Sequence, residues 1–196
     1  MWAKNRGISS NGMGYLGGIS WAILVAKICQ LFPHHKPAKL FFEFFAVYSI
    51  WNWRGVPVRL NPPPAGQTEE KSSMGLGLMS VITPASEYNS TERVNMITER
   101  VIVSEIKRAS EILYAKRDIA EVCRKADFFS NFPLFIEMDI CGYNKSREEE
   151  KDYKDFQGLV ESRVLKLLLN IQKFYRGFIE EGTLRIVPFP KMFNKM

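Results

Sequence analysis

Two apolar segments near the amino terminus, separated by a short turn, constrain the fold of this chain more than any other feature. Residues 19–32 are apolar on nearly all sides of a helix rather than on one face, which is typical of a buried helix. Residues 38–50, AKLFFEFFAVYSI, predict a second buried helix, although their Phe and Val content also suits a strand. Pro33 and Pro37 bracket the turn, and Pro37 suits a first helical position. We therefore expect a pair of buried helices.

A third helix is expected after a long irregular connection. Residues 51–79 are rich in Pro, Gly, Ser and charged side chains, which predicts irregular structure. Asn89, followed three residues later by Glu92, resembles a capping box with the asparagine as the cap. Apolar residues then recur at helical spacing over residues 94–113, and a short helix is expected over residues 115–125.

The pattern changes after residue 133. Over residues 134–141, every second side chain belongs to one set, Leu134, Ile136, Met138 and Ile140, and the others are Phe135, Glu137, Asp139 and Cys141. This period of two predicts a half-buried strand. Residues 156–171 predict an amphipathic helix, and residues 183–190 a second strand. A strand, a helix and a strand in this order are typical of a β-α-β unit. The expected class is therefore α+β, with a mostly helical first domain and an α/β second domain that is too small to bury much core by itself.

The charge balance favours a polyanionic partner without proving one. The chain has 27 basic and 21 acidic residues and a formal net charge of +6. An excess of this size suits a protein that binds nucleic acid, and equally a soluble basic protein. The three cysteines, Cys29, Cys123 and Cys141, lie far apart and have no metal-binding spacing, which indicates a reducing compartment.

Metal and membrane functions find no support in the sequence. The only histidines are the neighbours His34 and His35, whose adjacency is poor geometry for a metal, so we assign no metal site. The apolar run over residues 16–25 is too short to span a bilayer and ends near Lys27. No signal peptide is visible, and we expect no membrane association.

A glycine motif near the amino terminus raises the question of dinucleotide binding. Gly12, Gly14 and Gly17 match the spacing G-x-G-x-x-G. A dinucleotide fold needs a strand before this motif and an acidic residue about 20 positions after it. Neither is present, since the first acid is Glu43, so we exclude this interpretation. Gly17 and Gly18 could instead let a flat ring or a phosphate approach the start of a helix, or they could only allow close packing or a tight turn.

Several stretches resemble one family closely. WAKNRGISSNGMGYLGGISWAILVAKICQLFP resembles the start of the central domain of eukaryotic poly(A) polymerases, whose outline is W-A-K-R-x-x-I-Y-S-N-x-x-G-F-L-G-G-V-S-W-A-x-L-V-A-R-x-C-Q-L-Y-P. FFEFFAVYSIWNW and MSVITPASEYNST resemble later parts of the same domain. GLVESRVLKLL resembles a helix of the family's carboxy-terminal RNA-binding domain.

The resemblance implies a fragment of a polynucleotide adenylyltransferase, which adds AMP from ATP to RNA 3′ ends. Residues 1–127 would be the helical central domain and residues 128–196 part of an RRM-like (ferredoxin-like) RNA-binding domain. The family's catalytic domain carries a Gly-Ser pair and three metal-binding aspartates, but this sequence has no Gly-Ser dipeptide and no Asp-x-Asp. We therefore expect the catalytic domain to be absent, both ends to be fragment boundaries and the fragment alone to be inactive.

The family's other properties follow as expectations. The full-length enzyme would use ATP with Mg²⁺ or Mn²⁺, and we expect none of these to bind this fragment alone. Its partners would be the RNA 3′ end and the cleavage and polyadenylation factors, and its location the nucleus. Two alternatives stay open: a non-catalytic RNA-binding or interaction module of the same ancestry, and a related terminal nucleotidyltransferase with another nucleotide preference.

The resemblance also implies which residues face ATP. The family's Tyr-Ser-Asn falls on residues 9–11, so Ser9 replaces a tyrosine and Asn11 is retained. The family's Gly-Gly-Val beside the bound nucleotide falls on Gly17, Gly18 and Ile19. We assign no catalytic residue. By charge alone, the candidates for RNA contact are Lys27, Arg54, Arg59, Arg93, Arg100, Lys107 and Arg108.

Overall fold

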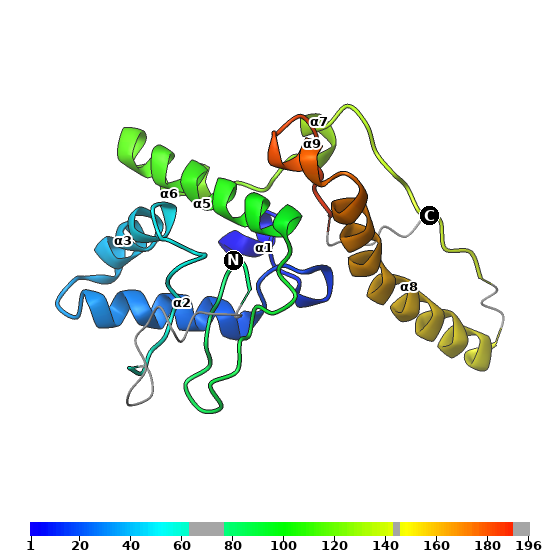
Figure 1. Ribbon diagram of the computed structural model, residues 1–196, viewed down its shortest axis with the longest axis horizontal. Helices are drawn as coiled ribbons and strands as arrows, with labels where there is room; N and C mark the ends of the chain where they lie inside the picture. Colours follow the sequence, from blue (N-terminus) through cyan, green and yellow to red (C-terminus); the bar gives the residue numbers. More distant parts are fainter. Residues whose placement is uncertain (63–76, 143–145, 190–196) are drawn as a thin grey trace. The chain divides into compact units, whose positions relative to one another are not determined.

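A computed structural model describes residues 1–62, 77–142 and 146–189 (Figure 1). The chain divides into two compact units, which we describe separately. Unit 1 comprises residues 1–125 together with residues 186–196, and unit 2 comprises residues 126–185. The described helices of unit 1 are α1 (Trp2–Asn5), η1 (Asn11–Met13), α2 (Gly18–Leu31), α3 (Pro37–Ser49), α5 (Met96–Lys116) and α6 (Ile119–Cys123). Those of unit 2 are α7 (Phe128–Asn131), α8 (Arg147–Phe174) and α9 (Arg176–Glu180).

The two apolar segments form helices α2 and α3, as expected, but α2 is not buried on all sides. Its buried face includes Ile23, Leu24 and Ile28. On the other side, Ile19 is 60% exposed and Val25 is 51% exposed. The prediction of a fully buried helix is therefore wrong for α2. Its neighbours in unit 1 cover only one side of it, and so an apolar face is left at the surface.

Helix α3 lies between α2 and α5 and joins them (Figure 1). Pro37 occupies the first turn of α3, where its fixed φ suits a helix and its missing N–H leaves no bond unmade. Phe44, Phe45 and Tyr48 are buried, and the Tyr48 hydroxyl donates a hydrogen bond to the Leu24 carbonyl at 2.8 Å. The buried aromatic residues of α3 therefore stabilise its contact with α2 by packing and also by one directional hydrogen bond.

Helix α5 starts later than expected, with its cap six residues after Asn89. Its N-cap is Asn95, whose side chain accepts hydrogen bonds from the backbone N–H groups of Ile97 and Thr98. The Thr98 hydroxyl accepts in turn from the Asn95 N–H at 3.1 Å, which completes a capping box. The prediction that Asn89 caps this helix is therefore wrong.

Asn89 instead organises the turn before α5. Its Oδ1 accepts hydrogen bonds from the N–H groups of Val81 and Thr91 and from the Thr91 hydroxyl. Val81 also forms an isolated parallel bridge with Val58. Residues 51–62 and 77–79 are irregular, as expected for the segment 51–79, and residues 63–76 lie outside the described part. The expected short helix over 115–125 is confirmed as α6, with Asp118 as its cap.

Unit 2 contains the expected amphipathic helix but no strand among its described residues. Helix α8 begins after the N-cap Ser146, which forms a capping box with Glu149. Residues 133–142 have no regular structure, and Leu134 and Ile136 are 86% and 81% exposed. The strand predicted over 134–141 is wrong. Alternating side chains make a strand only where neighbouring strands receive its N–H and C=O groups, and the described residues provide none.

The strand predicted over 183–190 is also wrong for its described residues. Residues 183–189 are irregular and fall into different units, since unit 2 ends at Arg185 and Ile186 belongs to unit 1. Val187 packs against the hydrophobic core of unit 1. Packing against a helical core therefore replaces strand pairing at this segment.

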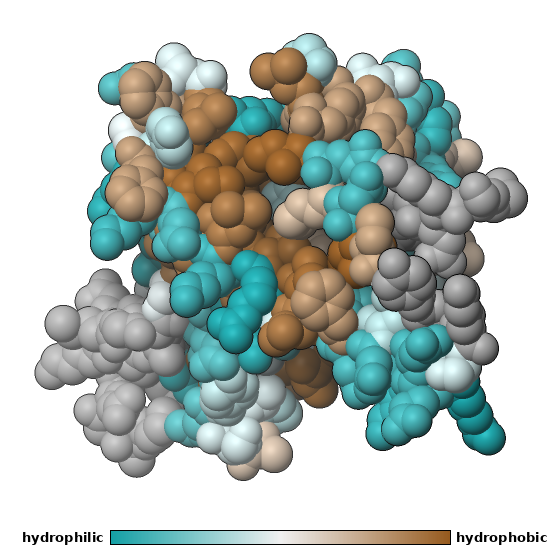
Figure 2. Space-filling view, turned by 90° about the vertical axis from the view of Figure 1, so that its right-hand side faces the viewer, coloured by the Kyte–Doolittle hydropathy of each residue, from teal (hydrophilic) through white to brown (hydrophobic). Residues whose placement is uncertain are grey.

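Apolar side chains reach the surface on the face of the molecule shown in Figure 2. In unit 2, exposed large apolar residues include Phe129, Leu134, Phe135, Ile136, Met138, Phe156, Leu159, Leu167, Leu169, Phe174, Tyr175 and Phe178. A stable small domain usually exposes fewer large apolar side chains than these. None of the helices in the described part of the chain is both long and apolar enough to cross a membrane.

Replacing the cap of α5 tests the boundary of this helix. Asn95→Ala removes the acceptor for two N–H groups, so we expect a loss of about 1 kcal/mol in the free energy of unfolding, measured by urea denaturation. Asn95→Ser is the matched control, because serine keeps the acceptor and removes an amide nitrogen that has no partner among the described residues. We expect this variant to be within about 0.5 kcal/mol of the wild type. Equal losses in both variants would contradict the assigned cap.

Candidate nucleotide-facing site

The segment between α1 and α2 carries the expected ATP-facing residues and is fixed by Arg6. Its guanidinium forms two hydrogen bonds with Glu105 of α5, from Nε to Oε2 at 2.8 Å and from the second nitrogen to Oε1 at 3.1 Å. Its remaining nitrogen donates to the Arg124 carbonyl after α6 at 3.0 Å. Paired hydrogen bonds of this kind set the orientation of both groups. The segment therefore starts from a fixed point on α5 and α6.

Glu105 binds a second arginine on its own helix. Arg108 Nε lies 3.0 Å from Glu105 Oε2, and Arg108 also donates to the Val122 carbonyl. Burial raises the pKa of the Glu105 carboxyl, but hydrogen bonds and charge from Arg6 and Arg108 outweigh it, so the pKa lies below its ordinary value. Glu105 is therefore ionised at neutral pH and holds α1, α5 and α6 together.

Glycines turn the chain on either side of the expected site. Gly7 has a φ of 70° and Gly14, which ends η1, a φ of 80°. This left-handed region favours glycine, which explains Gly14 without any dinucleotide. The preceding residues form α1 and a loop rather than a strand. Between the two turns, Ser9 is half-buried and Asn11 is exposed.

The structure brings Asn11 and Gly17 together. A Cβ placed on Gly17 would lie 3.6 Å from the Asn11 Cβ, so the glycine lies directly against the asparagine. Gly18 has no described atom within 4 Å of such a Cβ, and its φ does not lie in the left-handed region. Neither packing within the described residues nor backbone conformation therefore explains glycine at position 18.

The start of α2 is open to a ligand on its exposed side. Gly17 is the N-cap and provides no side-chain oxygen for the first N–H groups of the helix. Such groups carry a partial positive charge that favours anions. Ile19 adds an exposed apolar side chain beside them. An amide at Asn11, an open helix start and an apolar side chain together suit a molecule with a flat ring and an anionic group.

Tyr15 ties this segment to the end of the described chain. Its ring is buried, and its hydroxyl donates a hydrogen bond to the Pro188 carbonyl at 2.9 Å. Burial, with a smaller contribution from the Glu105 charge, raises the pKa of the Tyr15 hydroxyl, so the group stays protonated and can donate. Residues 186–189 are thereby held against the segment that leads into α2.

The residues expected to contact RNA by charge do not form one patch. Arg54 binds the buried carboxylate of Glu99 through two hydrogen bonds, and Arg108 shares the carboxylate of Glu105 with Arg6, so both arginines already bind a carboxylate of this chain. Arg93 is exposed and precedes α5, whereas the exposed residues Arg100 and Lys107 lie two turns apart on one face of α5. Lys27 and Arg59 line a shared hollow. Their roles toward RNA stay predictions.

Three residues that organise the site gave no signal in the sequence. Arg6, Tyr15 and Glu105 do not stand in any recognisable spacing, and their partners lie far away along the chain. The nearest indication for Tyr15 is that the family outline has phenylalanine at its position, so its hydroxyl is an addition. No group of three or more His, Cys, Asp or Glu side chains in the described residues is arranged to hold a metal ion.

Comparison with known proteins places the chain in one family. Residues 1–129 match the family described as the poly(A) polymerase central domain. The chain is 35% identical to a poly(A) polymerase from Dictyostelium discoideum over 99% of its length. It is 34% identical to nuclear poly(A) polymerase 1 from Arabidopsis thaliana over 89% of its length, and 29% identical to poly(A) polymerase PAPalpha from Candida albicans over 99%.

The chain belongs to the poly(A) polymerase central-domain family. It covers 24% of the Dictyostelium protein, 25% of the Arabidopsis protein and 35% of the Candida protein, so it corresponds to a minor part of these relatives.

Removing the charge of Glu105 tests the bond network of the site segment. Glu105→Gln should lower the free energy of unfolding at pH 7 by about 2 kcal/mol, because two arginines lose their charged acceptor. The pKa of Glu105 is lower in the folded state, so its stabilisation is present above the ordinary carboxyl pKa of about 4.3 and is lost as the pH falls through the folded pKa. Urea denaturation of both proteins should show this difference shrinking below pH 4, roughly. A pH-independent difference would contradict the network.

Removing the Tyr15 hydroxyl tests its bond to Pro188. Tyr15→Phe keeps the buried ring and leaves the Pro188 carbonyl without its donor, so we expect a loss of about 1 kcal/mol in stability. Hydrogen exchange should become faster at the amides of Val187 and Phe189 and stay unchanged at the centre of α5. Unchanged exchange at both amides would show that the hydroxyl does not hold this segment.

Proposed function

We propose that the protein is part of a polynucleotide adenylyltransferase that adds AMP from ATP to RNA 3′ ends, and that this chain provides one wall of the ATP site. The observation that carries the proposal is the edge formed by Asn11, Gly17, Gly18 and Ile19 in a chain of the poly(A) polymerase family. Of these four residues, Gly18 has the most direct support for a place in the ATP site, because no contact within the described residues requires a glycine there.

Each residue of the edge would have a distinct task. The Asn11 amide can donate to and accept from the edge of an adenine. Gly17 and Gly18 would let the nucleotide lie against the backbone, and Ile19 would offer an apolar contact to its ring. Ser9, where the family has tyrosine, would provide a smaller hydroxyl and leave out one aromatic contact.

The chemical step would take place on residues outside this chain. In the whole enzyme, Mg²⁺ or Mn²⁺ on the family's three aspartates would activate the RNA 3′ hydroxyl for attack on the α-phosphate of ATP. This chain would orient the nucleotide and exclude water from its base. The work of this chain is therefore positioning, and the purified chain alone would add no adenylate.

The exposed apolar face of α2 supports a contact with the rest of the enzyme. Ile19 and Val25 lie on this face, and Lys27 is the one charged residue of the helix. An apolar helix face of this kind is typical of an interface between domains. The edge formed by Gly18 and Ile19 begins at the same face, so a catalytic domain docked there would close the ATP site.

Residues 128–196 would be part of an RRM-like RNA-binding domain in the whole enzyme. The alignment with the Dictyostelium protein extends over 99% of the chain, so these residues also align with a poly(A) polymerase, which supports a place in the same enzyme. The missing strands would form only when further strands of the sheet are present, which agrees with the exposed apolar residues of unit 2. The names of the Arabidopsis relatives support a nuclear location, and RNA 3′ ends with cleavage and polyadenylation factors would be the partners.

Replacing Gly18 in the full-length enzyme tests the proposal. Gly18→Ala should stabilise the helix by a few tenths to about 1 kcal/mol, because alanine is the better helix former, and yet raise the KM for ATP several-fold. Gly158→Ala is the matched control, because Gly158 is also an exposed helical glycine, and a Cβ added to it would have no described atom within 4 Å. It should gain similar stability and leave the KM for ATP unchanged.

Two outcomes would contradict the proposal. Equal effects of the two glycine variants on the KM for ATP would remove Gly18 from the nucleotide site. A full-length protein that transfers no nucleotide to RNA would favour a non-catalytic RNA-binding module, and one that prefers another nucleotide would favour a related terminal nucleotidyltransferase.

A further inference from the structure

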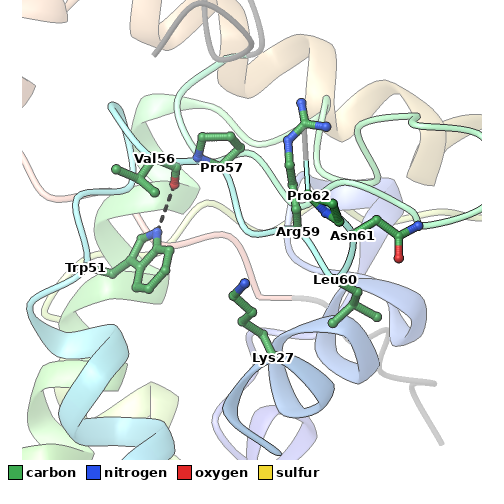
Figure 3. A pocket seen from close by; sticks show the side chains of 8 residues that line it. All are labelled: Lys27, Trp51, Val56, Pro57, Arg59, Leu60, Asn61 and Pro62. Carbon is green, nitrogen blue, oxygen red and sulfur yellow. Dashed lines mark hydrogen bonds between the residues drawn. The ribbon is translucent and has the colours of Figure 1, made fainter. Parts of the chain in front are cut away.

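A hollow in unit 1 lies outside the expected ATP edge. It has a volume of about 290 Å³ and is lined by Lys27, Trp51, Val56, Pro57, Arg59, Leu60, Asn61 and Pro62 (Figure 3). These residues come from α2 and from the irregular segment after α3, and none is acidic. The volume suits about one nucleotide unit rather than a large ligand.

Trp51 forms a fixed aromatic wall of the hollow. Its indole N–H donates a hydrogen bond to the Val56 carbonyl at 2.8 Å, the bond drawn in Figure 3. Its ring also packs against Tyr48 and Trp53, with centroids 5.7 and 6.4 Å away. The indole therefore loses little freedom when a second flat ring binds to it, which favours stacking.

Lys27 provides a positive charge at the same place. Figure 3 shows its ammonium group pointing into the space between Trp51 and the segment of residues 56–62, while the Arg59 guanidinium extends away from it. No carboxylate in the described part of the chain forms an ion pair with Lys27. An ammonium that faces a hollow without an acidic neighbour attracts an anion.

Two backbone carbonyls around the hollow already accept hydrogen bonds from side chains of this chain. The Leu60 carbonyl accepts from Gln30, and the Val56 carbonyl accepts from Trp51. Asn61 donates its side-chain amide to the Pro84 carbonyl. These bonds hold the segment in place and leave the ammonium and the apolar surfaces as the groups facing a ligand.

We propose that this hollow binds one nucleotide of single-stranded RNA, with a phosphate on Lys27 and a base against Trp51. A cation beside an aromatic ring is the usual arrangement for binding single strands without sequence preference. This inference rests on the proposed function, because it concerns the RNA that the enzyme would extend. A free mononucleotide offers the same chemistry, and the experiment distinguishes the two sources.

The test measures binding of a fluorescent oligoadenylate of about ten nucleotides to the 196-residue chain at several salt concentrations. Lys27→Gln should weaken binding at least fivefold, roughly, and lower the salt slope by about 0.7, the value for one phosphate on a single strand. Lys27→Arg should restore most of the affinity. Lys116→Gln, an exposed charge at the end of α5, is the matched control and should change affinity less than about twofold.

Trp51→Leu tests the aromatic contact separately. It should weaken binding severalfold and leave the salt slope unchanged, because stacking releases no counterions. Thermal unfolding of each variant shows whether it is folded, and the lysine variants still test the site if Trp51→Leu is not. AMP should not displace the oligonucleotide, and displacement by AMP at equal concentration would contradict the strand as the ligand.

The failures of the two ideas can be told apart. If the wild-type chain binds the oligonucleotide and Lys27→Gln and Lys116→Gln lose the same affinity, the hollow is not a nucleotide site. The proposed function would then stay intact. A wild-type chain that binds no oligonucleotide would overturn this inference, whereas nucleotide transfer by the full-length enzyme would still support the proposed function.

Discussion

The carboxylate of Glu105, held between Arg6 and Arg108, is the interaction on which the arrangement of unit 1 depends most. It joins the segment after α1 to α5, and the same arginines donate to the carbonyls of Val122 and Arg124 around α6. A carboxylate that is largely withdrawn from water is costly unless its oxygens are paired, and both Glu105 oxygens have guanidinium partners. Because Arg6 lies just before the turn at Gly7, the network also fixes where the segment with the expected ATP-facing residues begins.

The local pattern of the sequence predicts which segments form helices, but not which distant residues contact them. Helices α2, α3 and α5 follow from apolar spacing and from Pro37, which act within a few residues. The cap of α5 is misplaced at Asn89 because an asparagine followed by a polar residue three positions on occurs twice just before this helix, and only the structure shows that Asn95 receives the helix N–H groups. The strands over 134–141 and 183–190 fail for another reason, since a strand depends on partners that spacing does not reveal.

The candidate site, too, could be predicted from the sequence only in part. A resemblance to the family indicates Asn11, Gly17, Gly18 and Ile19, and the structure places Asn11 against Gly17 and leaves Gly18 and Ile19 at the surface. Arg6 and Tyr15, which hold the segment from behind, could not be predicted, because their partners lie far along the chain. The exposed side of α2 could not be predicted either. Apolar composition indicates that a helix face will be covered, but not whether residues of this chain or a separate domain cover it.

The central claim is that Asn11, Gly17, Gly18 and Ile19, which all lie between Gly7 and Lys27, form one wall of the ATP site of the whole enzyme. Photo-crosslinking of the full-length enzyme with an azido-substituted ATP, followed by trypsin digestion, tests it directly, since cleavage after Arg6 and Lys27 releases this segment as one peptide. We predict that the label is found on this peptide and is lost when unmodified ATP competes. Label confined to other peptides, with competition intact, would contradict the account.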